Sequence, residues 1–175
     1  MGTPETIEEQ ALIAAAQADP ARFLDLYNRY FYRVWAYVVK RSAHRAEAED
    51  ATSEVFRRAL ENLRGYEWRG PPFLAWLLKI AANALAHRWE KAARESGDPV
   101  PEIAEPDADL ERRAMLFELV GRLPEAQRRV IELRYVEERS LNEIASELGK
   151  TEGAVKQLQR RALENLRAEL EARHA

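Results

Sequence analysis

The chain has 175 residues, of which 46% are hydrophobic, enough to bury a core and to exclude wholesale disorder. It contains no cysteine, which excludes disulfides, thiolate chemistry and cysteine-ligated zinc. Its histidines, His44, His87 and His174, lie far apart, so we expect no metal site, and no other feature indicates a cofactor. No apolar run approaches the roughly 20 residues of a membrane span, and no signal peptide is recognisable. We therefore expect a cytoplasmic protein without membrane insertion.

Helical spacing dominates the chain between clusters of proline and glycine. Apolar residues recur in steps of three and four over 23–38, 48–63 and 73–84, and no segment alternates as a strand would. These segments are also rich in Ala, Leu, Glu and Arg, which favour helices. The sequence therefore predicts an all-α protein whose apolar stripes form the core. Residues 1–19 are expected to be an N-terminal arm or helix, and the sequence does not decide between the two.

Charge divides the chain into three parts. Residues 1–95 carry 14 basic and 13 acidic side chains, and residues 112–175 carry 13 basic and 11 acidic ones. Residues 96–111 contain six acidic residues, three prolines and no basic residue, a composition that disfavours a helix or a core. We therefore expect two small helical domains, at 20–95 and 112–175, joined by an acidic flexible linker at 96–111.

The sharpest motif lies in the C-terminal part. Ser140 and Glu143 have the spacing of a capping box, in which each side chain accepts from the other residue's backbone N–H. The helix that they begin is expected to end at Gly149, and Thr151 is expected to cap a second helix over 152–167. This is the layout of a helix-turn-helix, whose second helix enters the major groove of DNA. The apolar seam between the two helices is predicted to consist of Ile144, Leu148, Val155 and Leu158, beside the small Ala145.

The second helix is locally basic. Residues 150–167 hold five basic and two acidic side chains, and Arg and Gln can pair bidentately with guanine and adenine edges. The alternative is an amphipathic hairpin with a solvated basic face, but the seam and the local charge favour DNA binding. The candidate DNA-reading residues are Lys150, Thr151, Lys156, Gln157, Gln159, Arg160 and Arg161.

Three segments carry a resemblance to a known family. Residues 123–135 (LPEAQRRVIELRY), 140–149 (SLNEIASELG) and 151–156 (TEGAVK) resemble the −35-reading domain of bacterial sigma factors, most closely the extracytoplasmic-function (ECF) class. The resemblance implies a protein that binds the β′ and β subunits of core RNA polymerase and promoter DNA. It would direct promoter-specific initiation by −10 melting and −35 recognition, without catalysing a reaction itself. An anti-sigma factor is a further candidate partner.

The N-terminal part agrees independently. Residues 23–34 (FLDLYNRYFYRV), 48–50 (AED), 54–56 (EVF) and 73–83 (FLAWLLKIAAN) are similar to the promoter-melting domain of the same class. Because both domains match in the family's order, the resemblance is more specific than a helix-turn-helix alone.

The resemblance also implies a polymerase-docking surface. In this family, a helix carrying an acidic residue, with Gln three positions later, docks on the coiled coil of the β′ subunit. Asp50 matches the acid, Ser53 stands at the Gln position, and Glu54 follows. Ser makes fewer hydrogen bonds than Gln, which weakens this part of the match. The alternative is a solvated acidic helix surface.

The loop 65–72 corresponds to the family's loop that captures a flipped −10 base. Extracting a base requires a pocket and stacking surfaces. Lys79, Asn83 and His87 are spaced four residues apart, so they share one face of the following helix. An aromatic loop residue such as Trp68 could instead cover the core. The candidate −10 residues are Tyr66, Trp68, Arg69, Lys79, Asn83, His87 and Arg88.

Other classes of protein remain open. A helix-turn-helix regulator with a ligand-sensing or dimerising N-terminal domain would bind promoter duplex without polymerase. A helical adaptor would have no nucleic-acid role, which the basic second helix argues against. An enzyme is the least expected class, because the carboxylates alternate with Arg at helical spacing and no Ser-His-Asp cluster is evident.

Overall fold

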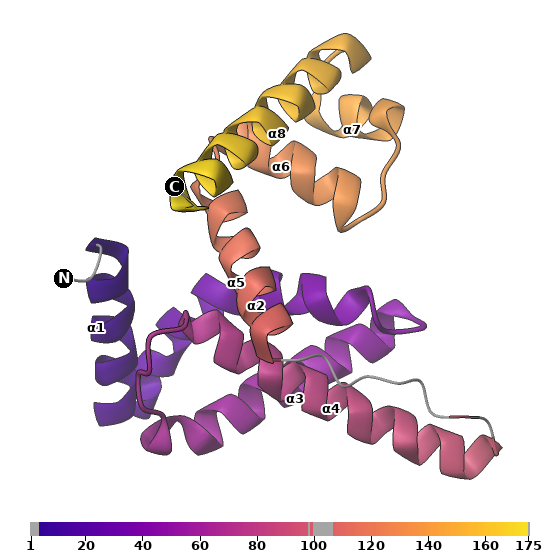
Figure 1. Ribbon diagram of the computed structural model, residues 1–175. Coiled ribbons are helices and arrows are strands. Elements are labelled where there is room, and N and C mark those ends of the chain that lie inside the picture. The colour runs from indigo at the N-terminus through magenta and orange to yellow at the C-terminus, as the bar shows by residue number, and fades with distance from the viewer. Residues whose placement is uncertain (1–3, 98, 100–106, 175) are drawn as a thin grey trace. The chain divides into compact units, whose positions relative to one another are not determined.

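The computed structural model describes residues 4–97, 99 and 107–174. These residues form helices joined by short turns and contain no strand, which confirms the all-α prediction. None of the helices in these ranges is both long and apolar enough to cross a membrane. In chain order the elements are α1 (Pro4–Ala18), η1 (Pro20–Arg22), α2 (Phe23–Val39), α3 (Arg45–Asn62), η2 (Leu63–Gly65), α4 (Phe73–Ser96), α5 (Asp107–Arg122), α6 (Glu125–Tyr135), α7 (Leu141–Leu148) and α8 (Glu152–His174) (Figure 1).

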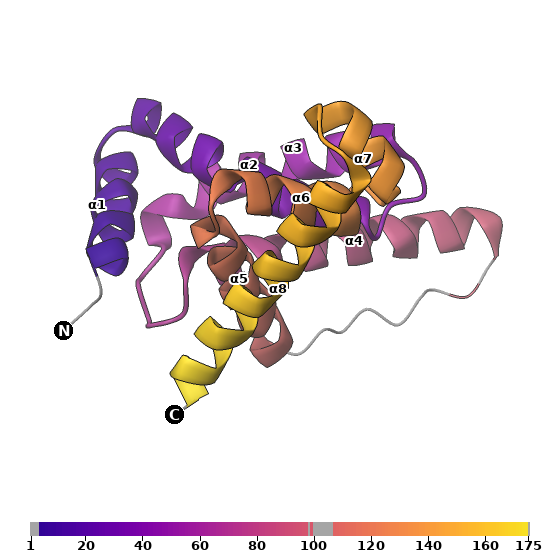
Figure 2. The same cartoon turned by 90° about the horizontal axis from the view of Figure 1, so that it is seen from above.

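The chain forms two compact units, Met1–Ala114 (unit 1) and Met115–Ala175 (unit 2). Helices α2, α3 and α4 form the centre of unit 1 (Figures 1 and 2). Each helix buries the apolar stripe that its three-and-four spacing predicts, because those positions fall on one face. Truncating one of these side chains, as in Leu26→Ala, would cost about 2–5 kcal/mol. The fully buried members include Leu26, Val34, Val38, Ala48, Val55, Ala59, Leu77, Ala81 and Leu85.

The N-terminal segment is a helix docked on unit 1. Ile13 and Ala16 of α1 are buried, with 5% and 3% of their surface exposed. Glu8 forms an ion pair of 3.2 Å with Arg29 of α2. Of the two alternatives that the sequence left open, a loose arm and a helix, the structure shows a packed helix.

Helix α4 ends at Ser96, the first residue of the expected linker. Gly97 adopts the left-handed conformation with φ 78°, and its N–H donates to the Ala93 carbonyl at 2.8 Å. Glycine tolerates this conformation without the steric cost that other residues incur. Ser96, expected in the linker, is therefore helical. Residues 98 and 100–106, most of the expected linker, lie outside the described residues.

Helix α5 begins at Asp107, so residues 107–111 are helical where a linker was expected. Counting acidic residues misled the prediction, because carboxylates in the first turn of a helix interact favourably with its dipole. Asp109 also forms an ion pair with Arg112 one turn later. Leu110 is buried, so this turn gains apolar packing as well.

Unit 2 is built around two apolar clusters. The first joins α6, α7 and α8, and it contains all the residues predicted for the helix-turn-helix seam. The second joins α5, α6 and the C-terminal half of α8 (Figure 2). Its contacts, which include Leu166 and Leu170, explain why α8 continues to His174 and not only to the expected end near residue 167. The first cluster comprises Val130, Leu133, Ile144, Ala145 and Val155, with Leu141, Leu148 and Leu158 packed against it.

Candidate nucleic-acid interfaces

The capping box of α7 is complete. The Ser140 N–H donates to Glu143 Oε2 at 2.8 Å, and the Glu143 N–H donates to Ser140 Oγ at 3.2 Å. The hydrogen bonds from Ser140 hold the pKa of the Glu143 carboxyl below its usual value. Two backbone donors that the first turn of a helix leaves without carbonyl partners are thereby satisfied.

The turn between α7 and α8 has the geometry that the sequence predicts. Gly149 adopts φ 61°, and the Lys150 N–H donates to the Ala145 carbonyl at 2.9 Å. Thr151 Oγ1 accepts from the Ala154 N–H at 3.2 Å, which caps the start of α8. The expected helix, tight glycine turn and helix are confirmed (Figure 1).

One residue that sequence reasoning missed fixes α7 relative to α6. Arg129 of α6 is half-buried, and its guanidinium donates to Glu147 of α7 at 2.7 Å. It also donates to Glu137, in the α6–α7 connection, at 3.2 Å. Its local spacing shows an i,i+3 pair with Glu132, at 4.0 Å, whereas the two glutamates that tie α6 to the following segment and to α7 lie 8 and 18 residues away, where local spacing gives no signal.

The candidate DNA-reading residues of α8 differ in how they are held. The Gln159 amide donates to the Tyr135 hydroxyl at 2.9 Å, so it is bound within unit 2. Lys156 and Arg160 form ion pairs with glutamates one turn away, at 2.7 and 3.5 Å. Gln157 and Arg161 are exposed, and no hydrogen bond or ion pair holds them within the described part of the chain. Lys150 and Thr151 are exposed in the turn before the helix.

The three candidate docking residues lie on the outer part of α3. Asp50 and Ser53 are exposed, and Ser53 Oγ donates to the Glu49 carbonyl of its own helix at 3.0 Å. The Asp50 side chain forms no hydrogen bond or ion pair with any other described residue. Its carboxylate is therefore available to a partner.

Glu54, in contrast, is occupied within the helix. Its carboxylate accepts two hydrogen bonds from Arg57, both 2.8 Å, and one from Arg58 Nε at 2.6 Å. These bonds lower the pKa of the Glu54 carboxyl to about 2. Such charge-assisted bonds favour the ionised form. The local charge at this end of the surface is thus partly neutralised.

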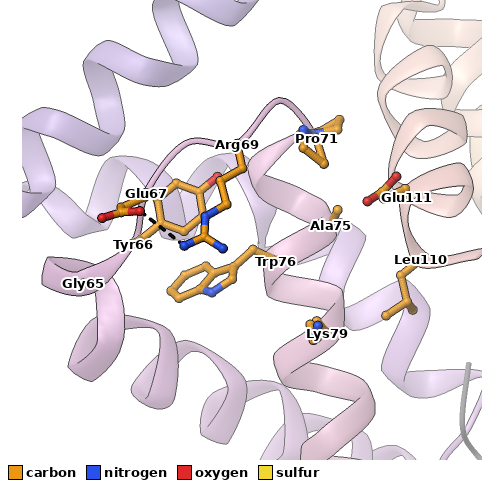
Figure 3. Close-up of a pocket in the computed structure, with 11 residues that line it drawn as sticks. Gly65, Tyr66, Glu67, Arg69, Pro71, Ala75, Trp76, Lys79, Leu110 and Glu111 are labelled. Atoms are coloured by element: carbon orange, nitrogen blue, oxygen red, sulfur yellow. Dashed lines mark hydrogen bonds and ion pairs between the residues drawn. The ribbon is translucent and has the colours of Figure 1, made fainter. Parts of the chain in front are cut away.

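The loop before α4 borders a pocket of about 340 Å³. The Tyr66 ring lies 5.1 Å from that of Phe73 and 4.9 Å from that of Trp76, measured between centroids. Burial, followed by the charge of Glu9, raises the pKa of Tyr66 to about 12. Arg69 forms an exposed ion pair of 3.3 Å with Glu67. The lining residues are Gly65, Tyr66, Glu67, Arg69, Pro71, Pro72, Ala75, Trp76, Lys79, Leu110 and Glu111 (Figure 3).

The structure brings some of the candidate −10 residues together and separates others. Tyr66, Arg69 and Lys79 all line the pocket, and Tyr66 and Arg69 lie beside Trp76 in Figure 3. Trp68 is half-buried and is not among the lining residues. Trp76 lies in the segment 73–84, whose apolar stripe was expected to form the core, but its side chain is only partly buried. The remaining candidates continue along α4, where Asn83 and His87 are exposed and Arg88 is half-buried.

An all-helical chain that carries a helix-turn-helix has the architecture of DNA-binding regulators. Residues 26–95 match the family described as Sigma-70 region 2, and residues 119–168 match Sigma-70, region 4. The ECF RNA polymerase sigma factor SigL of Mycobacterium tuberculosis is 30% identical over 169 residues, which cover 90% of this chain and 93% of that protein. The chain therefore belongs to the ECF RNA polymerase sigma factors, which confirms the resemblance.

The chain is also similar to a second curated sigma factor and to one solved structure. The ECF RNA polymerase sigma factor BldN of Streptomyces coelicolor is 36% identical over 166 residues, or 89% of this chain. The chain spans 63% of the length of that relative. A solved structure of the RsbN–BldN complex matches with 35% identity, 90% coverage of this chain, 98% coverage of the matched chain and a TM-score of 0.42.

Proposed function

We propose that this protein binds the β′ and β subunits of core RNA polymerase and directs promoter-specific transcription initiation. Unit 1 opens the −10 region, and unit 2 reads the −35 element. The observation that carries the proposal is that one chain contains both a region 2 match with an aromatic pocket and a region 4 match with a complete helix-turn-helix. The protein itself catalyses no covalent step, and it works in the cytoplasm, where polymerase and promoter DNA meet.

In unit 2, α8 enters the major groove. Arg161 and Gln157 read base edges, because they are exposed and are not engaged by other described residues. Lys156 and Arg160 exchange their glutamate partners for DNA, and such exposed ion pairs are weak enough to be replaced. Gln159 and the turn residues Lys150 and Thr151 complete the −35 surface.

In unit 1, the pocket beside the loop 65–72 receives a flipped −10 base. Tyr66 and Trp76 supply aromatic walls, while Arg69 and Lys79 supply positive charge for the phosphates. Asn83 and His87 extend the surface along one face of α4. Trp68 and Arg88, both half-buried, lie at the margins of this path.

On α3, Asp50 is the principal polymerase contact. Its carboxylate is exposed and unengaged by the described residues, so it can accept from a basic side chain of the β′ subunit. Ser53 contributes a weaker contact. Glu54 orients Arg57 and Arg58 more than it contacts polymerase, because both cations already donate to it. An anti-sigma factor that covers these surfaces is a further proposed partner.

In vitro transcription tests this function. Core polymerase is mixed with the protein and a library of bacterial promoter fragments, and the expected result is initiation at a subset that core polymerase alone does not use. A helix-turn-helix regulator would instead shift promoter duplex without polymerase. Failure to bind core polymerase would contradict the proposal, and duplex binding by the protein alone would favour the regulator.

A further inference from the structure

Two polar side chains of α1 reach the loop 65–72 at its opposite ends. Gln17 Nε2 donates to the carbonyl oxygens of Leu63 and Tyr66, both at 2.9 Å, where the loop begins. Glu9 Oε2 accepts from the N–H of Phe73 at 3.5 Å, directly after the loop. Figures 1 and 2 both show α1 beside the segment that leads from η2 into α4. One helix thus bonds to the backbone on both sides of the loop.

Glu9 is held firmly in place. It is buried, with 5% of its surface exposed, and it is the single charged residue in the buried set of the described part of the chain. Its other oxygen accepts a short hydrogen bond from the hydroxyl of Tyr30, which is itself buried in α2. A buried carboxylate is stable only when such partners replace water. The carboxylate therefore connects α1, α2 and the start of α4 by hydrogen bonds.

Glu9 also acts as an N-terminal cap of α4, because its carboxylate accepts a hydrogen bond from the first N–H of that helix. The residue at the cap position is Pro72, whose side chain forms no cap hydrogen bond. The first N–H groups of a helix lack intrahelical partners, and a negative charge near them is favourable. Glu9 supplies both an acceptor and a charge, from a helix more than 60 residues away in sequence.

We propose that Glu9 and Gln17 are positioning residues for −10 recognition, which we name the α1 clamp. The clamp holds both ends of the loop, so the pocket wall formed by Tyr66 and Trp76 exists before DNA arrives. A site ordered in advance loses less conformational freedom on binding. This inference rests on the proposed role of the loop in capturing the −10 base. It also goes beyond the family match, since α1 lies outside the residues matched to Sigma-70 region 2.

The test replaces Gln17 by Met, which keeps the length of the side chain and removes its donors. Gln10→Met is the matched control, because Gln10 is exposed on the same helix and no described hydrogen bond involves it. The first readout is hydrogen–deuterium exchange of the backbone amides of residues 66–70 and 73, which needs no DNA. For the second readout, single-stranded DNA dodecamers are first selected from a random pool by the complex of the wild-type protein with core polymerase. The affinity of each variant's complex for the selected dodecamers is then measured.

In Gln17→Met, exchange at residues 66–70 should accelerate by at least about fivefold, with rates in α8 unchanged, because the loop opens more often. Dodecamer binding should weaken by about three- to tenfold, because part of the binding free energy is then spent on ordering the loop. A second selection on this variant should return a less restricted sequence at the flipped position. Gln10→Met should match wild type in all three measurements.

A second pair of variants tests the other end of the loop. Glu9→Gln replaces the carboxylate by one acceptor oxygen and one donor group, and it removes the negative charge beside the first N–H groups of α4. We expect faster exchange at residue 73, whereas the control Glu8→Gln, on the exposed side of α1, should not change it. These variants keep the length of the side chain, and a melting temperature within a few degrees of wild type verifies folding.

The outcomes separate the clamp from the proposed function. Unchanged loop exchange in both Gln17→Met and Glu9→Gln, or an unfolded domain in both, would overturn the clamp. Faster loop exchange with unaltered dodecamer affinity and sequence preference would overturn its role in recognition. If the wild-type complex selects no sequence at all, the −10 function fails, while the exchange data still decide whether α1 orders the loop.

Discussion

The side-chain amide of Gln159 donates a hydrogen bond of 2.9 Å to the phenol oxygen of Tyr135. Tyr135 is the last residue of α6, so this bond ties the middle of α8 to a different helix of the same unit. One of the candidate base-reading side chains is therefore already engaged before DNA binds. We therefore expect Arg161 and Gln157 to contribute most to the discrimination between −35 sequences.

Arg161→Ala should reduce affinity for the −35 element by about 1–3 kcal/mol and relax the preference at one base pair. The reason is that a guanidinium can pair bidentately with guanine, and after the substitution no other side chain of α8 occupies the place of Arg161. Competition between −35 variants for the complex with polymerase measures the effect. Arg173→Ala removes the same charge near the end of α8 and serves as the control. Wild-type discrimination in the Arg161 variant would remove it from the reading set.

Trp68→Ala and Asn83→Ala should each weaken binding of single-stranded −10 DNA and leave the affinity for core polymerase unchanged. A lost aromatic stacking contact is worth about 1–3 kcal/mol per base. Because Trp68 does not line the pocket, its effect should fall at the lower end of that range. Fluorescence anisotropy with labelled oligonucleotides measures the affinity for single-stranded −10 DNA. Asn28→Ala, an exposed asparagine of α2, is the control for Asn83. A drop in melting temperature together with a loss of polymerase binding would instead assign Trp68 to the core.

Asp50→Asn should show the opposite pattern, with weaker binding to core polymerase and unchanged binding to the −10 oligonucleotide. The substitution keeps the shape of the side chain and removes the charge that a basic partner would need. Glu54→Gln should reduce polymerase affinity less, because Glu54 already pairs with Arg57 and Arg58. Titration of polymerase with labelled protein gives the two affinities. Equal losses for both variants would mean that the acidic surface acts only as a whole.

The pKa of Glu54 predicts a specific dependence of stability on pH. Its value of about 2 in the folded chain lies below the ordinary value of about 4.3. A lowered pKa stabilises the folded state above the unfolded pKa, and the contribution is lost as the pH falls from about 4.5 toward 2. The difference in melting temperature between wild type and Glu54→Gln should therefore shrink over that interval. In the double variant Arg57→Met with Arg58→Met, NMR titration should give a pKa of the Glu54 carboxyl near its ordinary value. An ordinary pKa in the wild-type protein would contradict the pairing of Glu54 with the two arginines.

Ser140→Ala should lower the free energy of unfolding of unit 2 by about 0.5–2 kcal/mol, since it removes the cap of α7. Ser146→Ala is a matched control on the same helix, where Ser146 is exposed and in the interior. Because alanine favours helix interiors, that variant should be neutral or slightly more stable. Thermal unfolding followed by circular dichroism at 222 nm measures both. Equal stabilities of the two variants would show that the capping box contributes little.

The helical fold and the helix-turn-helix could be predicted from the amino-acid sequence, because both depend on local rules. Apolar spacing places side chains on one face of a helix regardless of its surroundings. The capping box at Ser140 and Glu143 and the left-handed Gly149 each involve residues within one turn. The seam residues, Leu158 among them, could be predicted for the same reason.

Which candidate side chains are available, and what holds the −10 loop, depends on how the helices pack. Gln159 meets Tyr135 across 24 residues, and Gln17 meets Tyr66 across 49. Such pairs depend on how helices pack, which local spacing does not encode. The same holds for α1, whose docking depends on burying Ile13 and Ala16 against other helices and on satisfying the carboxylate of Glu9 there. A polar side chain in a helix can be exposed to solvent or buried with hydrogen-bond partners. The free-energy difference between these two states depends on neighbours that are distant in sequence.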